Sequence, residues 1–162
     1  MVQAVPEQYG TVTPYLIVPD GHNALNFYEQ AFDAMELFSM AVPDGAVMAA
    51  EMKIGDSIIM LSGECPGMET IRPQEGQWPP AVIHLYVEDA EAAFKKAVDA
   101  GCKVGRELQD MFWGDRFGQV IDPFQQHWSI AQHIEDVPQD VMAERQKEFM
   151  EQMAAEHAGQ SA

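Results

Sequence analysis

A pattern of one apolar strand, one amphipathic helix and three further strands occurs twice along this chain, and it constrains the fold more than any other feature. In the first copy, the apolar run Tyr15–Val18 precedes apolar residues at helical spacing over residues 23–32. Three strand-like segments follow, separated by turn residues, at 35–40, 47–54 and 57–61. This order of elements predicts a first βαβββ module.

The second copy begins with the apolar segment 81–87 and continues with a helix whose apolar face spans residues 90–98 and ends at Gly101. Strand-like segments follow around residues 102–104, 117–121 and 127–131. A Val-x-Asp motif lies between the first strand and the helix of both copies, at residues 18–20 and 87–89. The order of elements is therefore the same in the two halves.

The duplication predicts an α+β fold in a single domain, with βαβββ modules at residues 11–63 and 81–135 and a linker at 64–80. A carboxy-terminal helix is predicted for residues 136–158, which are rich in helix-forming Glu, Gln, Ala and Met. One side of this helix carries an apolar stripe of Met142, Phe149, Met150 and Met153. Such a stripe favours docking on the body or on a partner subunit over a Met-rich ligand surface.

Composition excludes several classes of function. The 162 residues hold 26 acidic and nine basic side chains, a formal net charge of −17 that argues against nucleic-acid binding. An acidic surface favours solubility, and it would also attract a cationic ligand. No apolar run reaches the length of a membrane span, and the amino terminus does not resemble a secretory signal. Cys65 and Cys102 lack metal or redox spacing, so we expect a cytoplasmic protein.

The segment 111–124 combines aromatic residues, two glycines, an acid and a base, and ends in an Asp-Pro turn. Asp115 and Arg116 lie among bulky apolar residues, where an unpaired charge is costly. One interpretation is a hairpin in which these two side chains tie the loop to itself, and the other is the rim of a small-molecule pocket. In either case we predict that at least one of them is buried and paired, with the other's backbone or across the module interface.

Strand alternation places His84 and Tyr86 on one face of their strand, opposite the residues that pack against the helix. We predict one concave, partly apolar pocket with aromatic walls and a few polar groups. Glu51 and Glu64 are candidate pocket acids, although a solvated turn or edge position is favoured for each. The predicted ligand-binding residues are Tyr15, His84, Tyr86, Trp113, Asp115 and Arg116.

The duplicated pattern, together with residues 82–89, 112–128 and 133–137, resembles the vicinal oxygen chelate superfamily, which includes glyoxalase I, extradiol dioxygenases and the fosfomycin- and bleomycin-resistance proteins. Within it, the chain is most similar to the PhnB-like branch, although relatives usually carry a glycine where this chain has Gln125. The resemblance implies that the modules form curved mixed sheets around a shared cavity and that the protein is a homodimer.

In metal-using relatives, four ligands come from the first and last strands of the two modules, and by this resemblance their positions fall at Thr13, Met60, Val82 and Ser129. None of the four supplies an imidazole, carboxylate or thiolate, so we expect no metal and no other cofactor. A shifted divalent-metal centre at His84 and His127 is the less favoured alternative. The sequence therefore predicts a metal-free small-molecule-binding protein, with a metal-dependent lyase, isomerase or dioxygenase as the second hypothesis.

Overall fold

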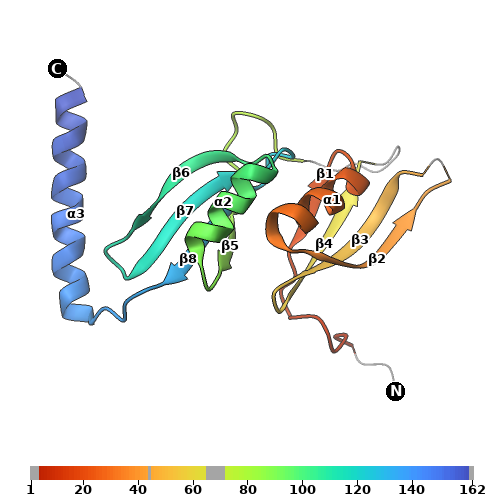
Figure 1. Ribbon diagram of the computed structural model, residues 1–162, viewed down its shortest axis with the longest axis horizontal. Helices are drawn as coiled ribbons and strands as arrows, with labels where there is room; N and C mark the ends of the chain where they lie inside the picture. Colours follow the sequence, from red (N-terminus) through yellow and green to blue (C-terminus); the bar gives the residue numbers. More distant parts are fainter. Residues whose placement is uncertain (1–3, 44, 65–71, 161–162) are drawn as a thin grey trace.

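The computed structural model describes residues 4–43, 45–64 and 72–160 and confirms the two modules (Figure 1). The first module contains β1 (Tyr15–Val18), α1 (Gly21–Phe32), β2 (Met35–Ala41), β3 (Val47–Ile54) and β4 (Ser57–Gly63). The second contains β5 (Ile83–Tyr86), α2 (Ala90–Ala100), β6 (Lys103–Asp110), β7 (Asp115–Ile121) and β8 (His127–His133). Residues 65–71 of the predicted linker lie outside the described residues.

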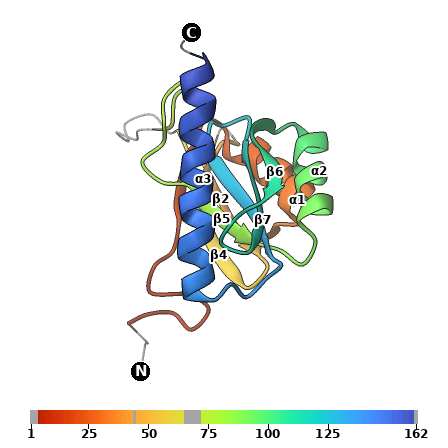
Figure 2. The ribbon, with the colours of Figure 1, turned by 90° about the vertical axis from the view of Figure 1, so that its left-hand side faces the viewer.

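Each module folds into a four-stranded mixed sheet of the same topology. The strand orders are β1-β4-β3-β2 and β5-β8-β7-β6, with the first pair of each sheet parallel and the others antiparallel. Helices α1 and α2 contact each other and lie on the same side of the two sheets (Figure 2). We call the opposite side of each sheet its open face.

The repeated Val-x-Asp motif forms the start of both helices. The Asp20 carboxylate accepts hydrogen bonds from the backbone N–H groups of His22 and Asn23, and the Asp89 carboxylate accepts one from Ala92. These bonds satisfy donors that have no partner within the helix, which explains why an aspartate follows the first strand of both modules. The predicted stop at Gly101 is also confirmed, since this residue adopts a φ of 126°.

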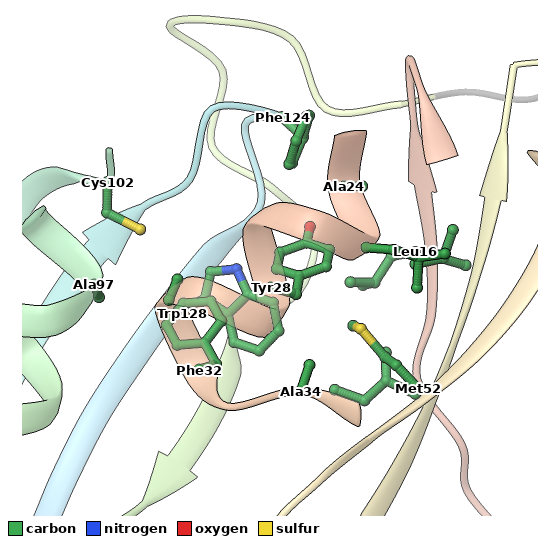
Figure 3. Close-up of a cluster of buried hydrophobic side chains, with 14 of the residues drawn as sticks. Leu16, Ala24, Tyr28, Phe32, Ala34, Met52, Ala97, Cys102, Phe124 and Trp128 are labelled. Atoms are coloured by element: carbon green, nitrogen blue, oxygen red, sulfur yellow. The ribbon is translucent and has the colours of Figure 1, made fainter. Parts of the chain in front are cut away.

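One hydrophobic core joins the two modules (Figure 3). Phe32 of α1 packs against Trp128 of β8 with ring centroids 4.4 Å apart, and Tyr28 lies between them and Phe124. The Tyr28 hydroxyl donates a 2.8 Å hydrogen bond to the carboxylate of Asp122, which is 2% exposed. The modules are therefore packed together by α1 and by the turn before β8, and not only tethered by the linker.

The turn between β7 and β8 departs from the usual family sequence at Gln125, which adopts a φ of 68°. This left-handed conformation favours glycine, the residue that the family resemblance predicts at this position. Asp122 Oδ1 accepts hydrogen bonds from the backbone N–H groups of Phe124 and Gln126. These bonds stabilise the turn although it carries no glycine at position 125.

Strand β6 is longer than the predicted segment 102–104 and runs to Asp110. Its pairing with β7 shifts register on both sides of Arg106, which breaks the simple alternation that the prediction required. Such irregularities are stabilised by tertiary pairing, so periodicity along this segment does not reveal them.

The predicted carboxy-terminal helix is present as α3 (Gln139–Gln160), and it stands apart from the rest of the chain (Figure 1). Arg145 pairs with Glu135 through two hydrogen bonds, and Phe149 packs against Phe112 at 5.2 Å. Two further residues of the predicted stripe are exposed, Met150 at 60% and Met153 at 37%. Among the described residues, no helix combines the length and the apolar character that a membrane crossing needs.

Candidate functional site

The open face of the second sheet carries a connected group of aromatic and polar side chains. Strand alternation places His84 and Tyr86 of β5 on this face, together with Ser129 of β8, which is the Cα partner of His84. Phe117 of β7 lies two strands from Tyr86, since both pair with Ala131. We call this face the candidate site.

Asp115 lies at the centre of the candidate site, is 5% exposed, and accepts three hydrogen bonds. Its Oδ2 accepts from the Tyr86 hydroxyl at 3.0 Å and from the Trp113 indole N–H at 3.1 Å, and its Oδ1 faces His133 Nδ1 at 2.9 Å. The prediction that this acid is buried and bonded is therefore confirmed. The predicted partners are wrong. The three observed partners are side chains of the second module, and none lies across the module interface.

His133 lies between two carboxylates. Its Nδ1 faces Asp115, and its Nε2 faces Asp136 Oδ1, also at 2.9 Å. Since a carboxylate can only accept, both ring nitrogens must carry a proton for both bonds to form. The hydrogen bonds with Asp136 and Asp115 accordingly raise the pKa of His133 above its ordinary value.

The pKa values of the other two ionisable groups in this network also shift. Burial pushes the pKa of Asp115 upward, but the hydrogen bonds from His133, Tyr86 and Trp113 outweigh burial and leave the pKa below its ordinary value. The hydrogen bond to Asp115 raises the pKa of the Tyr86 phenol. The network therefore holds a carboxylate and a neutral phenol at neutral pH.

Aromatic rings line the rest of the candidate site. Phe117 stacks on the His84 imidazole with centroids 6.0 Å apart and meets the Trp113 ring edge-on at 5.8 Å. His84 also meets Tyr86 edge-on at 4.7 Å, and its Nδ1 shares a 2.7 Å hydrogen bond with Ser129 Oγ. The result is an exposed aromatic surface next to a buried carboxylate, an arrangement suited to binding planar molecules.

Gly114 positions the turn that carries Trp113 and Asp115. It adopts a φ of 95°, and a Cβ atom there would lie 2.1 Å from the Glu135 carbonyl oxygen. The Gly114 carbonyl also accepts the N–H groups of Ile134 and Glu135. A side chain at this position would therefore separate the turn from the end of β8.

Arg116 does not lie in the candidate site. It alternates with Asp115 and Phe117, so it points to the side covered by α2, where it pairs with Glu91 and with Asp110. Both of these acids are largely exposed, and Arg116 does not pair with Asp115. The two charged neighbours do not pair with each other, because adjacent strand residues face opposite sides. Each still ties the β6–β7 hairpin to itself, as the first interpretation expects: Arg116 bonds to Asp110, and Asp115 accepts from Trp113.

Tyr15 is on β1 of the first sheet, 53% exposed, with Met60 as its Cα partner, and it is not part of the Asp115 network. The open face of this sheet also holds Glu51, for which we favoured a solvated position. The structure places it partly buried on β3, where it accepts a hydrogen bond that raises the pKa of Tyr9 to about 12. Glu64 pairs with Arg72 and is exposed.

A cavity of about 860 Å³ opens between the two modules. Both modules contribute walls, from the β3–β4 turn and the end of α1 on one side and from β5 and α2 on the other. An ion pair between Lys96 and Asp33 lies at this boundary. Of the predicted ligand-binding residues, the lining includes only His84 and Tyr86.

The residues at the inherited metal positions do not fit a metal. Met60 and Ser129 offer a thioether and a hydroxyl, and the hydroxyl already shares a hydrogen bond with His84. Thr13 and Val82 precede the strands β1 and β5. The other candidate, His127, packs near the Trp78 ring, and burial lowers its pKa. Throughout the described part of the chain, no three His, Cys, Asp or Glu side chains form a group that could hold a metal ion.

Comparison with known proteins gives the family. The sequence model of the Glyoxalase/Bleomycin resistance protein/Dioxygenase superfamily matches residues 8–130. The chain belongs to this superfamily. An uncharacterized protein of Mycobacterium tuberculosis is 39% identical over 132 residues, which cover 80% of this chain and 78% of the relative.

Solved structures of other proteins share the fold. The PhnB protein from Bacillus cereus matches with a TM-score of 0.61 at 15% identity, covering 76% of this chain and 99% of that protein. The fosfomycin resistance protein FosX from Listeria monocytogenes, solved with Mn(II) and a dihydroxypropylphosphonic acid, matches with a TM-score of 0.57 at 14% identity. That match covers 84% of this chain and 96% of FosX. A protein of this fold has thus been solved with Mn(II) bound.

Sequence reasoning did not identify Phe117 and His133 as residues of the candidate site. It also did not identify Ser129 as the hydrogen-bond partner of His84. A signal for two of them was present, because residues 127, 129, 131 and 133 alternate along one strand and so share a face. The predicted strand ended at Ala131, which left His133 in a loop.

Proposed function

We propose that this protein binds a small planar molecule on the open face of its second sheet and does so without a metal ion. The observation that carries the proposal is the network in which Asp115 holds Tyr86, Trp113 and His133 beside an exposed aromatic surface. A buried carboxylate with three donors orients these side chains before any ligand arrives, which reduces the entropy lost on binding.

A thermal-shift screen of aromatic compounds tests the site. A ligand of the open face should raise the Tm of the wild type, and the shift should be largely lost in Trp113→Phe, which lacks the indole N–H. Trp78→Phe is the matched control, because Trp78 contacts only the ring of His127 among the described aromatic residues. An equal loss of the shift in both variants, or a loss in neither, would argue against this site.

The second hypothesis is a metal-dependent lyase, isomerase or dioxygenase, and the Mn(II)-bound FosX structure favours it at the level of the fold. Emission spectroscopy on protein purified without chelator separates the two functions. We expect less than stoichiometric transition metal in the wild type. A stoichiometric metal that is lost in His84→Gln or His127→Gln would contradict the metal-free proposal and support a shifted metal centre.

We also propose that the protein is a homodimer with α3 at or near the interface. Support comes from exposed apolar side chains on two elements, with Met150 and Met153 on α3 and Met35, Leu37, Phe38 and Met40 on β2. Light scattering at micromolar concentration should give twice the 18.0 kDa mass of one chain. A mass of one chain would refute the dimer. A dimer that survives truncation after Asp136 would refute only the proposed role of α3 at the interface.

A further inference from the structure

Arg106 has no acidic partner among the described residues of this strongly acidic chain. Arg72, Arg116 and Arg145 each pair with at least one carboxylate. Within the described residues, Arg106 forms no such ion pair, and its guanidinium instead lies 5.9 Å from the centroid of the Phe117 ring. With 26 acids in the chain, this exception points to a binding role for the guanidinium.

The sheet register places Arg106 in the candidate site. Its Cα partner is Gln119 of β7, which pairs with Ser129 of β8, which in turn pairs with His84 of β5. Paired positions in a sheet point to the same side, so the four side chains form one row across the open face. With strands about 4.8 Å apart, the row spans roughly 14 Å.

Phe117 of β7 lies next to this row. Its ring lies between the guanidinium of Arg106 on one side and the stacked His84 imidazole on the other. A planar molecule lying along this row would contact these aromatic side chains and would bring one end to Arg106. The forked N–H groups of a guanidinium match the two oxygens of a carboxylate, and a bidentate pair is among the strongest polar contacts in proteins.

We infer that the candidate site recognises a planar aromatic carboxylate, with Arg106 binding the carboxylate and the aromatic side chains of the open face contacting the ring. This inference rests on the proposed function and specifies the charge of its ligand. The net charge of −17 opposes an anionic ligand only weakly from a distance, because physiological salt screens exposed charges that lie farther away than about 8–10 Å. A direct contact with Arg106 lies within that distance.

Three probes of the same shape test the inference: 2-naphthoate, neutral 2-naphthamide and cationic 2-naphthylmethylammonium. Binding is followed by NMR through the indole N–H signal of Trp113, which lies in the site beside Phe117. We expect naphthoate to bind the wild type about tenfold more tightly than the amide, as a charge-assisted bidentate pair implies. The cation should bind most weakly.

The variants assign this preference to one residue. Arg106→Gln should bind naphthoate and the amide equally, and Arg106→Lys should keep only part of the preference. Lys103→Gln is the matched control, because it removes the same charge from the same strand at an exposed residue that pairs with Glu75. It should leave the preference unchanged, and circular dichroism should show that all three variants are folded.

The outcomes separate the two proposals. Equal binding of naphthoate and the amide to the wild type would overturn the role of Arg106, although the site itself would stand. Tightest binding of the cation would also overturn it and would favour a ligand attracted by the acidic surface. If no probe shifts the Trp113 signal, the open face is not an aromatic binding site, and the proposed function fails together with the inference.

Discussion

Two buried aspartates, seven residues apart in the second module, have opposite environments. Asp122 lies at the junction of the modules, where its carboxylate accepts from Tyr28, Trp128 and two backbone N–H groups. Burial raises the pKa of Asp122 more than these bonds lower it. Asp115 lies on the open face, and its bonds leave its pKa below the ordinary value. The balance between burial and hydrogen bonding, which at Asp115 includes the bond from His133, therefore decides the sign of the shift.

The donors around the two carboxylates also differ in kind. At Asp122, the indole and the two backbone groups can only donate a hydrogen bond. At Asp115, the partner of Oδ1 is a histidine nitrogen, which donates when protonated and can accept when neutral. The indole and backbone donors at Asp122 therefore keep one protonation state. The bond between His133 and Asp115 on the open face, in contrast, changes with pH. The following substitutions test this contrast, from the largest expected effect to the smallest.

Asp122→Asn should have the largest effect on stability. Whichever way the amide is turned, its NH₂ group faces at least one obligate donor, either the Trp128 indole or the two backbone N–H groups. We expect the free energy of unfolding to fall by about 3 kcal/mol, because buried donors lose their acceptor. Urea denaturation should find a similar loss at pH 6 and pH 8. A loss well below 1 kcal/mol would mean that the junction tolerates an uncharged group.

Asp115→Asn should lower the free energy of unfolding by less than Asp122→Asn does, and the loss should be smaller at high pH than at low pH. With the amide oxygen toward Tyr86 and Trp113, the NH₂ group faces His133, which can accept when neutral. We expect a loss of roughly 1 kcal/mol at pH 8 and a larger loss at pH 6, where His133 is protonated. Urea denaturation at the two pH values measures the difference. A loss that does not change with pH would remove the contrast with Asp122.

His133→Gln tests the source of the pH dependence. The folded-state pKa of His133 is raised above 6.5, so its stabilising contribution is complete below pH 6.5 and decreases as the pH rises through the folded value. The variant should therefore be less stable than the wild type at pH 6 and approach it at higher pH. Thermal melts across this range measure the trend, and parallel curves for the two proteins would contradict it.

The same network has a second pH limit at acid pH. Because the pKa of Asp115 is lowered, its contribution is present above pH 3.8 and is lost as the pH falls through the folded value. The pKa shift of Asp122 has the opposite sign. Because its pKa is raised, protonation of Asp122 as the pH falls favours the folded state. The difference in stability between the wild type and Asp115→Asn should therefore shrink as the pH falls through the range where Asp115 titrates, and acid unfolding of the two proteins measures this change.

Arg116→Gln should have the smallest effect. Arg116 points away from the open face and pairs with Asp110 and Glu91, which are largely exposed to solvent. Exposed ion pairs contribute little because water and salt screen them. The Tm should change less than in Asp115→Asn, and ligand binding should be unaffected. A large loss of stability would show that the pair with α2 holds the second module together.

Much of the fold was predictable because its signals are local. Apolar periodicity, turn residues and the Val-x-Asp caps identify both modules from short stretches of sequence. The extent of β6 was not predictable, since its register shifts around Arg106 depend on pairing with β7. Within the site, alternation placed His84 and Tyr86 on one face, but it could not name Asp115 as the acceptor of Tyr86, 29 residues away.

The sequence by itself determined the two modules, their helix caps and the aromatic residues available for a site, because strands, helices and turns follow from neighbours along the chain. The tertiary structure decided which charges are buried and what they bond. Asp122 meets Tyr28 across 94 residues, and Arg116 turns away from its neighbour Asp115 because alternate strand residues face opposite sides of the sheet. Charge and composition are the same at both aspartates, and only packing makes one a fixed junction and the other part of a candidate ligand site.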